Sequence, residues 1–233
     1  MLELQPDLPF SKREAERLLE AWLGGPVVCS RTRRLKGGLV NTVVLLTFDP
    51  PPHRAVVKLH DGAGDVFGSE ARALEYLRSE TACPVPQVYL DGAAGGPIPY
   101  AYLLLEYVPG RCLERMQLST AAQVDLEAQL AEVLAELHDH QGDRFGRLGE
   151  ADGSDDWPEL FAARLREVRA RPTVSERLEP KVLAAVDDAI GRTSTVLADA
   201  GAAGWVVLPQ ADTWWFGEAL PMIRDNLQLV YRH

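Results

Sequence analysis

The stretch "RAVVKLHDGAGDVFGSEARALEYL", from Arg54 to Leu77, carries a lysine near the end of an apolar run and a glutamate on the segment that follows. The β-branched run around Lys58 predicts a strand, and the later residues predict a helix. On that helix Glu70 shares one face with Leu74 and Leu77, because residues four and seven apart lie above one another. We therefore predict that Lys58 and Glu70 form an ion pair, since an unpaired buried amine is costly.

Four further β-rich runs flank this stretch and complete a predicted sheet. They are "VVCSRTRRL" from Val27, "VNTVVLLTF" from Val40, "PQVYLDG" from Pro86 and "AYLLLEYV" from Ala101. A Gly-Gly pair and a proline cluster separate the first three strands, and both are typical of reversals between antiparallel strands. A capping box that begins at Ser11 predicts one helix before the sheet. We expect a five-stranded antiparallel sheet with the Glu70 helix packed against it.

The sequence after Pro109 and Gly110 has helical rather than strand-like periodicity. Further capping boxes begin at Thr120 and Thr173. The last long helix is expected to turn its apolar residues inward, namely Leu178, Val182, Val186, Ile190 and Val196. This order of elements predicts an α+β protein with an N-terminal lobe over residues 1–107 and a helical C-terminal lobe over residues 108–233.

The composition narrows the classes of protein before any motif is considered. The 233 residues carry a formal net charge of -10, which argues against a nucleic-acid partner, because phosphate backbones are bound by clustered Lys and Arg. Three cysteines without C-x-x-C spacing indicate neither a disulfide framework nor a zinc site, and they fit a reducing compartment. No apolar run approaches the roughly 18 residues of a membrane-spanning helix. We expect a soluble, cytoplasmic protein without a membrane partner.

A glycine turn, a buried lysine on the third strand and an inward glutamate on the next helix form a recurrent site for a nucleoside triphosphate. Glycines let backbone N–H groups approach phosphate oxygens, the lysine neutralises those oxygens, and the glutamate fixes the lysine. Main-chain groups at the end of the fifth strand can read the edge of an adenine base. The residues predicted to hold the nucleotide are Gly37, Gly38, Asn41, Val56, Lys58, Glu70, Glu106, Tyr107 and Val108.

Each of these features also has a plainer interpretation. A Gly-Gly pair is usually only a hairpin turn, a lysine that ends an apolar strand usually snorkels to water, and a helical glutamate is usually solvated. The order of the features along the chain favours the nucleotide site over these separate interpretations.

The chain resembles the aminoglycoside phosphotransferase and fructosamine kinase group of protein-kinase-like small-molecule kinases. The resemblance rests on "GGLVN", "AVVKLH", "SEARALEYL", "PVPQVYLDG", "LLLEYVPG" and "LAELHDHQGDRFGRL", which follow the order of that group between Val27 and Leu148. It implies a two-lobed, protein-kinase-like fold with ATP between the lobes. It also implies transfer of the γ-phosphoryl group to a hydroxyl of a small molecule.

In that family an apolar strand leads into His-Gly-Asp, and an Asn and a second Asp then hold Mg²⁺. Here "WVVLPQADTWWFGEAL" contains the apolar run and Asp212, but Gln210 and Ala211 stand in place of His and Gly. The resemblance implies that Asp212 is the catalytic base and that Asp225 is a ligand for Mg²⁺. Because the Asn and the final helices of the family have no counterpart, we expect an incomplete C-terminal lobe.

Two alternatives to an active ATP-dependent phosphotransferase stay open at this point. The first is a pseudokinase or truncated remnant that binds nucleotide weakly without turnover, since the phosphate-binding motifs match the family better than the catalytic ones. The second is an interaction module that binds no nucleotide.

Overall fold

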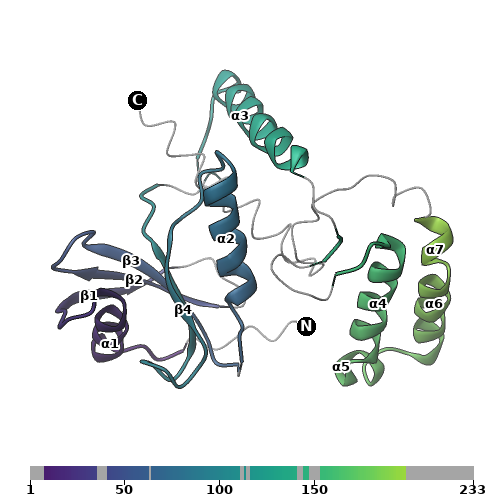
Figure 1. The fold of residues 1–233 in the computed structure, drawn as a ribbon, viewed down its shortest axis with the longest axis horizontal. Coiled ribbons are helices and arrows are strands. Elements are labelled where there is room, and N and C mark those ends of the chain that lie inside the picture. The colour runs from purple at the N-terminus through teal and green to yellow at the C-terminus, as the bar shows by residue number, and fades with distance from the viewer. Residues whose placement is uncertain are drawn as a thin grey trace. The chain divides into compact units, whose positions relative to one another are not determined.

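The computed structural model describes residues 8–35, 41–62, 64–110, 113, 116–140, 144–146 and 153–197. Its elements follow in the order α1 Lys12–Leu23, β1 Cys29–Arg34, β2 Thr42–Phe48, β3 Arg54–His60, α2 Gly68–Glu80, β4 Val88–Gly92, β5 Ala101–Glu106, α3 Thr120–Asp139, α4 Trp157–Ala170, α5 Pro172–Ser175, α6 Pro180–Gly191 and α7 Thr193–Val196. The described residues after β5 form helices and their connections (Figure 1).

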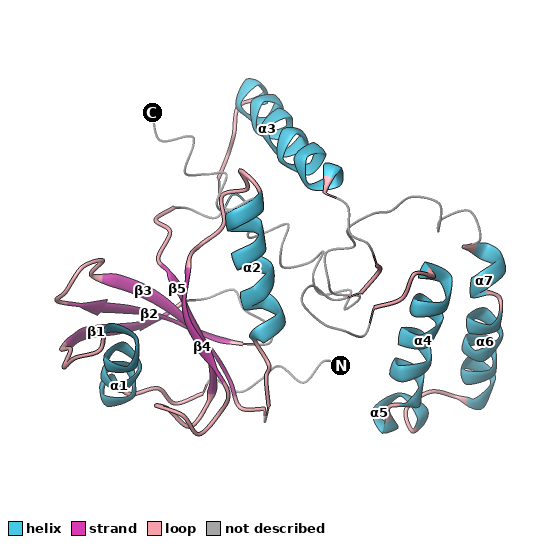
Figure 2. Cartoon of the chain, viewed as in Figure 1, coloured by secondary structure: helices cyan, strands magenta, loops and turns pink. Residues whose placement is uncertain are grey.

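The five strands form one antiparallel sheet in the order β1-β2-β3-β5-β4 (Figure 2). This confirms the predicted five-stranded sheet. β5 inserts between β3 and β4, and Lys58 of β3 is paired with Val43 on one side and with Leu103 on the other. The strand that ends at the predicted adenine-reading segment is therefore an immediate neighbour of the strand that bears the lysine.

One face of the sheet packs against α1 to form the main hydrophobic core. α1 begins at the predicted capping box, in which the Glu14 N–H donates to the Ser11 hydroxyl and the Ser11 N–H donates to the Glu14 carboxylate. Leu18 of this helix is fully buried in the core. Trp22 stacks on Tyr89 of β4 with ring centroids 4.1 Å apart, so α1 also contacts the far edge strand of the sheet.

The opposite face of the sheet meets α2. Val57 and Leu59 of β3 belong to the core that contains α1, so Lys58 between them projects from the other face, because side chains alternate along a strand. On that face Lys58 pairs with Glu70 of α2. The ion pair predicted from the sequence is therefore confirmed, and it lies between the sheet and α2.

The chain divides into two compact units, and the described residues up to 130 belong to the first and those from 131 onward to the second. The assignment of residues 1–107 and 108–233 to separate lobes stays a prediction. In the second unit α4 packs against α5, α6 and α7. After β5 the described residues contain no further strand, only an isolated bridge between Phe145 and Ser154.

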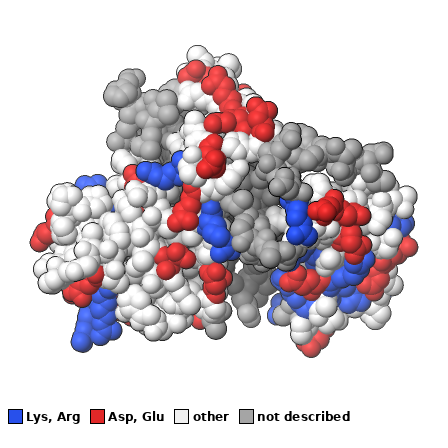
Figure 3. Space-filling view, in the orientation of Figure 1, with Lys and Arg blue, Asp and Glu red and all other residues white. Residues whose placement is uncertain are grey.

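The surface of α3 is acidic. The helix carries Asp125, Glu127, Glu132, Glu136 and Asp139 and contains no Lys or Arg. In Figure 3 the Asp and Glu side chains gather over this helix. Within the part of the chain that the structure describes, no helix is long and apolar enough to cross a membrane.

The prediction of one long last helix is wrong, because the segment forms three separate helices, α5, α6 and α7. α5 begins at Pro172 and α6 at Pro180, and a proline starts a helix more readily than it continues one, since it lacks the N–H that an interior turn requires. Ile190 is buried as expected, whereas Val182 is 38% exposed and Val196 is 74% exposed. The apolar spacing read across these breaks therefore did not belong to one helical face.

Removing the side chain of Leu18 tests the core between α1 and the sheet. We expect Leu18→Ala to lower the free energy of unfolding by about 3 kcal/mol, because it deletes apolar atoms and leaves a cavity. Urea titration followed by circular dichroism measures this loss. Leu23→Ala in the same helix is the control, because Leu23 is 37% exposed. Equal losses for the two variants would contradict the assigned core.

Candidate functional site

Lys58 and Glu70 form a bidentate ion pair. The Lys58 ammonium donates to both carboxylate oxygens of Glu70, over 2.9 Å to Oε1 and 2.8 Å to Oε2. The Lys58 side chain is 11% exposed and that of Glu70 is 21% exposed. A charged pair this far from water is weakly screened, so the carboxylate holds the ammonium in a fixed place.

An aromatic ring also lies beside the ammonium. The Lys58 nitrogen lies 5.8 Å from the ring centroid of Phe67, which is buried just before α2 begins. This distance is within the range of a cation–π contact. The lysine therefore contacts both Glu70 of α2 and the residue that precedes this helix.

The loop between β3 and α2 is fixed by side chains that bind its backbone. The Gly62 N–H donates to Nδ1 of His60 over 2.8 Å, and the Gly68 N–H donates to the Asp65 carboxylate over 2.7 Å. A side chain at position 68 would collide with that carboxylate. The start of α2, and with it Glu70 in the first turn, is therefore held relative to β3.

Apolar residues surround Lys58 on its face of the sheet. Val56 lies two residues earlier on β3, and the strand register pairs it with Leu45 of β2 and Leu105 of β5. Leu45 and Leu105 are buried. These side chains share the face of Lys58, because residues two apart on a strand point the same way. Val56, Leu45 and Leu105 form an apolar surface beside the Lys58 ammonium.

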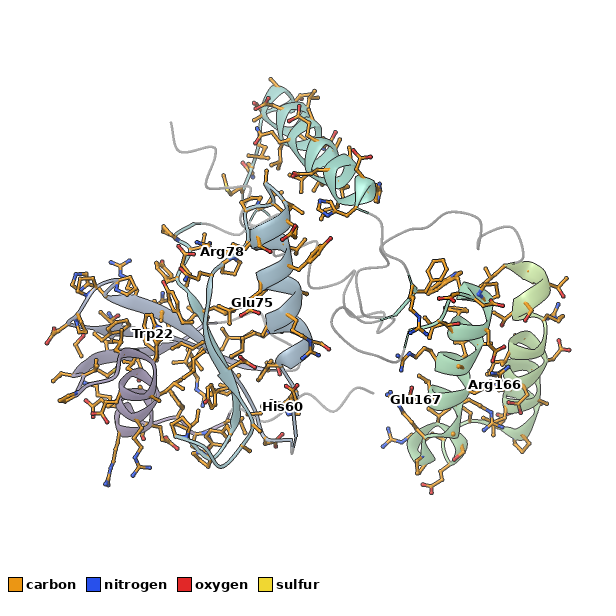
Figure 4. The ribbon with its side chains drawn as sticks, viewed as in Figure 1. Trp22, His60, Glu75, Arg78, Arg166 and Glu167 are labelled. Carbon is orange, nitrogen blue, oxygen red and sulfur yellow. The ribbon has the colours of Figure 1, made fainter. Side chains whose placement is uncertain are left out.

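The predicted adenine-reading segment begins at Glu106, the last residue of β5. The Glu106 N–H donates to the Gln87 carbonyl over 2.8 Å, and the Gln87 N–H donates to the Glu106 carboxylate over 3.1 Å. The same carboxylate oxygen lies 3.8 Å from the Arg78 guanidinium. In Figure 4, Arg78 of α2 and His60, the last residue of β3, lie toward opposite ends of this helix. Glu70 is in the first turn of α2 and Arg78 in the last, so the helix carries an ion pair near each end, one to β3 and one to β5.

Tyr107 follows Glu106 and is covered by an arginine of the neighbouring strand. The Arg54 guanidinium lies 5.4 Å from the centroid of the Tyr107 ring. The strand register explains the contact, because Ala55 pairs with Glu106 and the next positions are Arg54 and Tyr107. This cation–π contact limits the freedom of the ring at the start of the segment that leaves the sheet.

Asn41 lies directly before β2 and has an unusual side chain. Its Oδ1 atom is buried and has no hydrogen-bond partner among the described residues. A buried polar atom without a partner is costly, and such atoms often mark a place that a ligand or water fills. This orphaned atom fits the prediction that Asn41 contributes to a ligand site.

Val108 follows Tyr107 and is half-buried, whereas the remaining four predicted site residues lie outside the described residues. Gly37 and Gly38 belong to the segment between β1 and β2 that the structure does not describe, and Asp212 and Asp225 belong to residues 198–233. Among the described residues, no group of three His, Cys, Asp or Glu side chains could hold a metal ion. The roles of Asp212 as base and Asp225 as Mg²⁺ ligand stay predictions.

Sequence reasoning missed four residues that contact the predicted site. Phe67 lies beside the ammonium, Arg54 covers Tyr107, and Arg78 and Gln87 both approach the Glu106 carboxylate. The pairing of β3 with β5 brings Arg54 to Tyr107, and the pairing of β4 with β5 brings Gln87 to Glu106. No local pattern reveals the first of these pairings, because α2 and β4 lie between β3 and β5 in the chain.

Residues 31–206 match the sequence model of a family described as the phosphotransferase enzyme family, APH. A comparison with curated proteins finds no match. Among solved structures, a candidate fructosamine-3-kinase from Haemophilus somnus 129PT is 19% identical with a TM-score of 0.58, over 81% of this chain and 62% of that chain. The gentamicin–APH(2")-IIa complex is 17% identical with a TM-score of 0.50, over 82% of this chain and 60% of that chain.

These structural matches confirm the predicted protein-kinase-like fold. The chain spans about three fifths of the length of the solved structures that it matches. The family match begins within β1 and extends past the last described helix, so it includes both Lys58 and Glu70.

A double-mutant cycle tests the energetic coupling of Lys58 and Glu70. We expect Lys58→Met and Glu70→Leu each to lower the free energy of unfolding by about 2 kcal/mol, because each leaves a charge without its partner. The double variant should lose less than the sum of the two, since it leaves no unpaired charge. Urea titration of the four proteins measures the coupling.

The matched control is the pair Lys181 and Glu179, whose nitrogen and oxygen lie 2.9 Å apart but whose side chains are 81% and 69% exposed. An exposed pair contributes little, so this cycle should show near-zero coupling. Additive losses at Lys58 and Glu70 would contradict the assigned interaction.

Proposed function

Because the chain belongs to the phosphotransferase enzyme family, we propose that it is an ATP-dependent phosphotransferase that acts on a hydroxyl of a small molecule. The observation that carries the proposal is the buried ion pair of Lys58 with Glu70. Lys58 lies on the central strand, and the carboxylate on α2 holds its ammonium at a fixed point. Such a positive charge can bind phosphate oxygens.

The phosphate end of the proposed site is built around Lys58. Its ammonium donates to both carboxylate oxygens of Glu70, which holds the positive charge in place. In the proposal the amine also donates to phosphate oxygens, while backbone N–H groups of Gly37 and Gly38 approach them from the loop before β2. Asn41, with its orphaned carboxamide oxygen, lies at the end of that loop.

The base end of the proposed site combines Val56 of β3 with the end of β5. Val56, two residues before Lys58 and opposite Leu105, offers an apolar surface for a planar base. Main-chain groups from Glu106 to Val108 read the edge of the adenine. In the proposal the base and the phosphates lie at the two ends of one surface formed by the adjacent strands β3 and β5, which suits an extended nucleotide.

In the proposed reaction the bond between the γ-phosphorus and the β,γ-bridging oxygen breaks, and a bond from that phosphorus to the substrate oxygen forms. The hydroxyl proton passes to the Asp212 carboxylate, and ADP leaves. Bound Mg²⁺ offsets charge between the phosphates in such reactions. In this proposal it depends on Asp225. The buried cysteines Cys29 and Cys83 are not in disulfides, which fits a proposed cytoplasmic location.

A second candidate function is nucleotide binding without efficient turnover. Gln210 and Ala211 replace the His and Gly that precede the catalytic Asp in the family. Loss of one well-placed electrostatic group costs about 3 kcal/mol of transition-state stabilisation. The phosphate-binding residues are unaffected by this change, so binding should outlast catalysis.

Calorimetric titration with ATP, with and without Mg²⁺, tests the proposed nucleotide site. We expect measurable binding that Lys58→Met abolishes, because the variant removes the charge that faces the phosphates. Lys181→Met is the matched control, since Lys181 is exposed and lies in the second unit. Thermal melting verifies that both variants are folded. Absence of binding to the wild-type protein would refute the proposal and favour an interaction module.

Release of ADP over a panel of aminoglycosides, glycated amines and simple sugars separates the two candidate functions. We expect turnover to be slow, because the residues around Asp212 depart from the family pattern. Intact ATP binding without any turnover would favour the second candidate function. Robust Mg²⁺-dependent turnover that Asp212→Asn abolishes would establish the active phosphotransferase and exclude binding without turnover.

A further inference from the structure

The pairing of Gln87 with Glu106 departs from an ordinary antiparallel ladder. The register of β4 and β5 pairs Val88 with Leu105, so the next pair is Gln87 with Glu106. In a hydrogen-bonded pair of antiparallel strands, the two residues exchange both N–H···O bonds. Here the Glu106 N–H donates to the Gln87 carbonyl over 2.8 Å, but the Gln87 N–H donates to the Glu106 carboxylate over 3.1 Å. A side chain has taken the donor that the ladder directs to the Glu106 main-chain carbonyl.

The Glu106 main-chain carbonyl thereby loses the Gln87 N–H as a donor. Because the Glu106 N–H faces Gln87, the carbonyl of the same residue does not belong to the ladder with Ala55 on β3. Outside the strand ladders, no main-chain N–H among the described residues donates to it. A carbonyl at the first position of the adenine-reading segment is thereby kept as an acceptor for another donor.

The carboxylate is held in this role by its neighbours. The Arg78 guanidinium of α2 lies 3.8 Å from the oxygen that accepts the Gln87 N–H. Tyr89 on β4 lies close as well, since burial raises the pKa of its phenol and the Glu106 charge raises it further, while Arg78 lowers it. Tyr89 in turn stacks on Trp22 of α1. The Glu106 carboxylate therefore contacts both Gln87, directly before β4, and Arg78 of α2.

We propose that the Glu106 side chain is a positioning residue that withdraws the Gln87 N–H and so keeps the Glu106 carbonyl available to a base with an exocyclic amino group. This inference rests on the proposed nucleotide site. It makes the site selective for a 6-amino purine, whose amino group donates to a carbonyl, over a 6-oxo purine, whose oxygen repels it. The selectivity comes from a side chain that does not itself contact the base.

The test compares the dissociation constants of ATP and inosine triphosphate by calorimetry. The two nucleotides differ at position 6 of the purine and carry the same triphosphate. We expect the wild-type protein to bind ATP about tenfold more tightly, the value of one well-formed hydrogen bond. Glu106→Leu should remove this preference, because the Gln87 N–H then returns to the carbonyl. Glu106→Gln should keep it, since the amide oxygen still accepts that N–H.

A second variant separates release of the carbonyl from a merely structural bond. Gln87→Pro removes the competing N–H altogether, and a proline is tolerated at the start of an edge strand such as β4. In the Glu106→Leu background we expect this substitution to restore the preference for ATP. Glu75→Leu, an exposed glutamate on α2 near Arg78 (Figure 4), controls for the loss of one surface carboxylate.

The outcomes distinguish this inference from the proposed function. A preference lost in Glu106→Leu and regained with Gln87→Pro supports the role of the carboxylate. An equal loss of affinity for both nucleotides, or an unchanged ratio, overturns it and leaves the nucleotide site intact. Wild-type protein that binds both nucleotides equally also overturns the inference alone. Wild-type protein that binds neither refutes the proposed function, and this inference with it.

Discussion

A lysine ammonium that projects from the middle of an apolar sheet is the constraint on which the rest of the first unit depends. Lys58 lies between Val57 and Leu59, two residues that are fully buried on the opposite face. The charge is tolerable there only with a carboxylate at hydrogen-bonding distance. α2 must therefore start at a fixed place relative to β3. The side chains of His60 and Asp65 help to hold it there, because they accept hydrogen bonds from backbone N–H groups between β3 and α2.

The same helix links the two ends of the proposed site. Glu70 in its first turn meets β3, and Arg78 in its last turn meets the end of β5. The two ion pairs differ in kind. The pair of Lys58 and Glu70 is shielded from water and fixes a charge. The pair of Arg78 and Glu106 is half exposed, and its carboxylate also accepts the Gln87 N–H. In the proposed site, packing and charge thus define the phosphate end, and backbone hydrogen bonding defines the base end.

Family membership and the site geometry support the proposed function in different ways. The family match covers most of the chain and concerns ancestry, while the ion pair is a physical arrangement that suits phosphate whatever its origin. The two agree on the same strand and helix. The proposed catalytic step depends on Asp212, and the residues beside it depart from the family pattern. Binding and turnover are therefore separate questions for this chain.

The sequence by itself determined the features that depend on neighbouring residues. The five strands, the Ser11 capping box and the common face of Glu70 and Leu74 all follow from local periodicity and turn chemistry, and the structure confirms them. The pairing of Lys58 with Glu70 also followed, because a charge in an apolar run demands a partner nearby. Local patterns failed across Pro172 and Pro180, where periodicity was extended through positions that interrupt helices.

Only the tertiary structure decided which strands lie side by side. β5 lies between β3 and β4 in the sheet, although β4 precedes it in the chain. This position brings Arg54 to Tyr107 and Gln87 to Glu106. Such contacts depend on register between segments that are far apart in the chain, and strand sequences of similar apolar character do not encode that register locally. The diversion of the Gln87 N–H to a side chain is a consequence of this pairing, so no reading of the sequence alone could have found it.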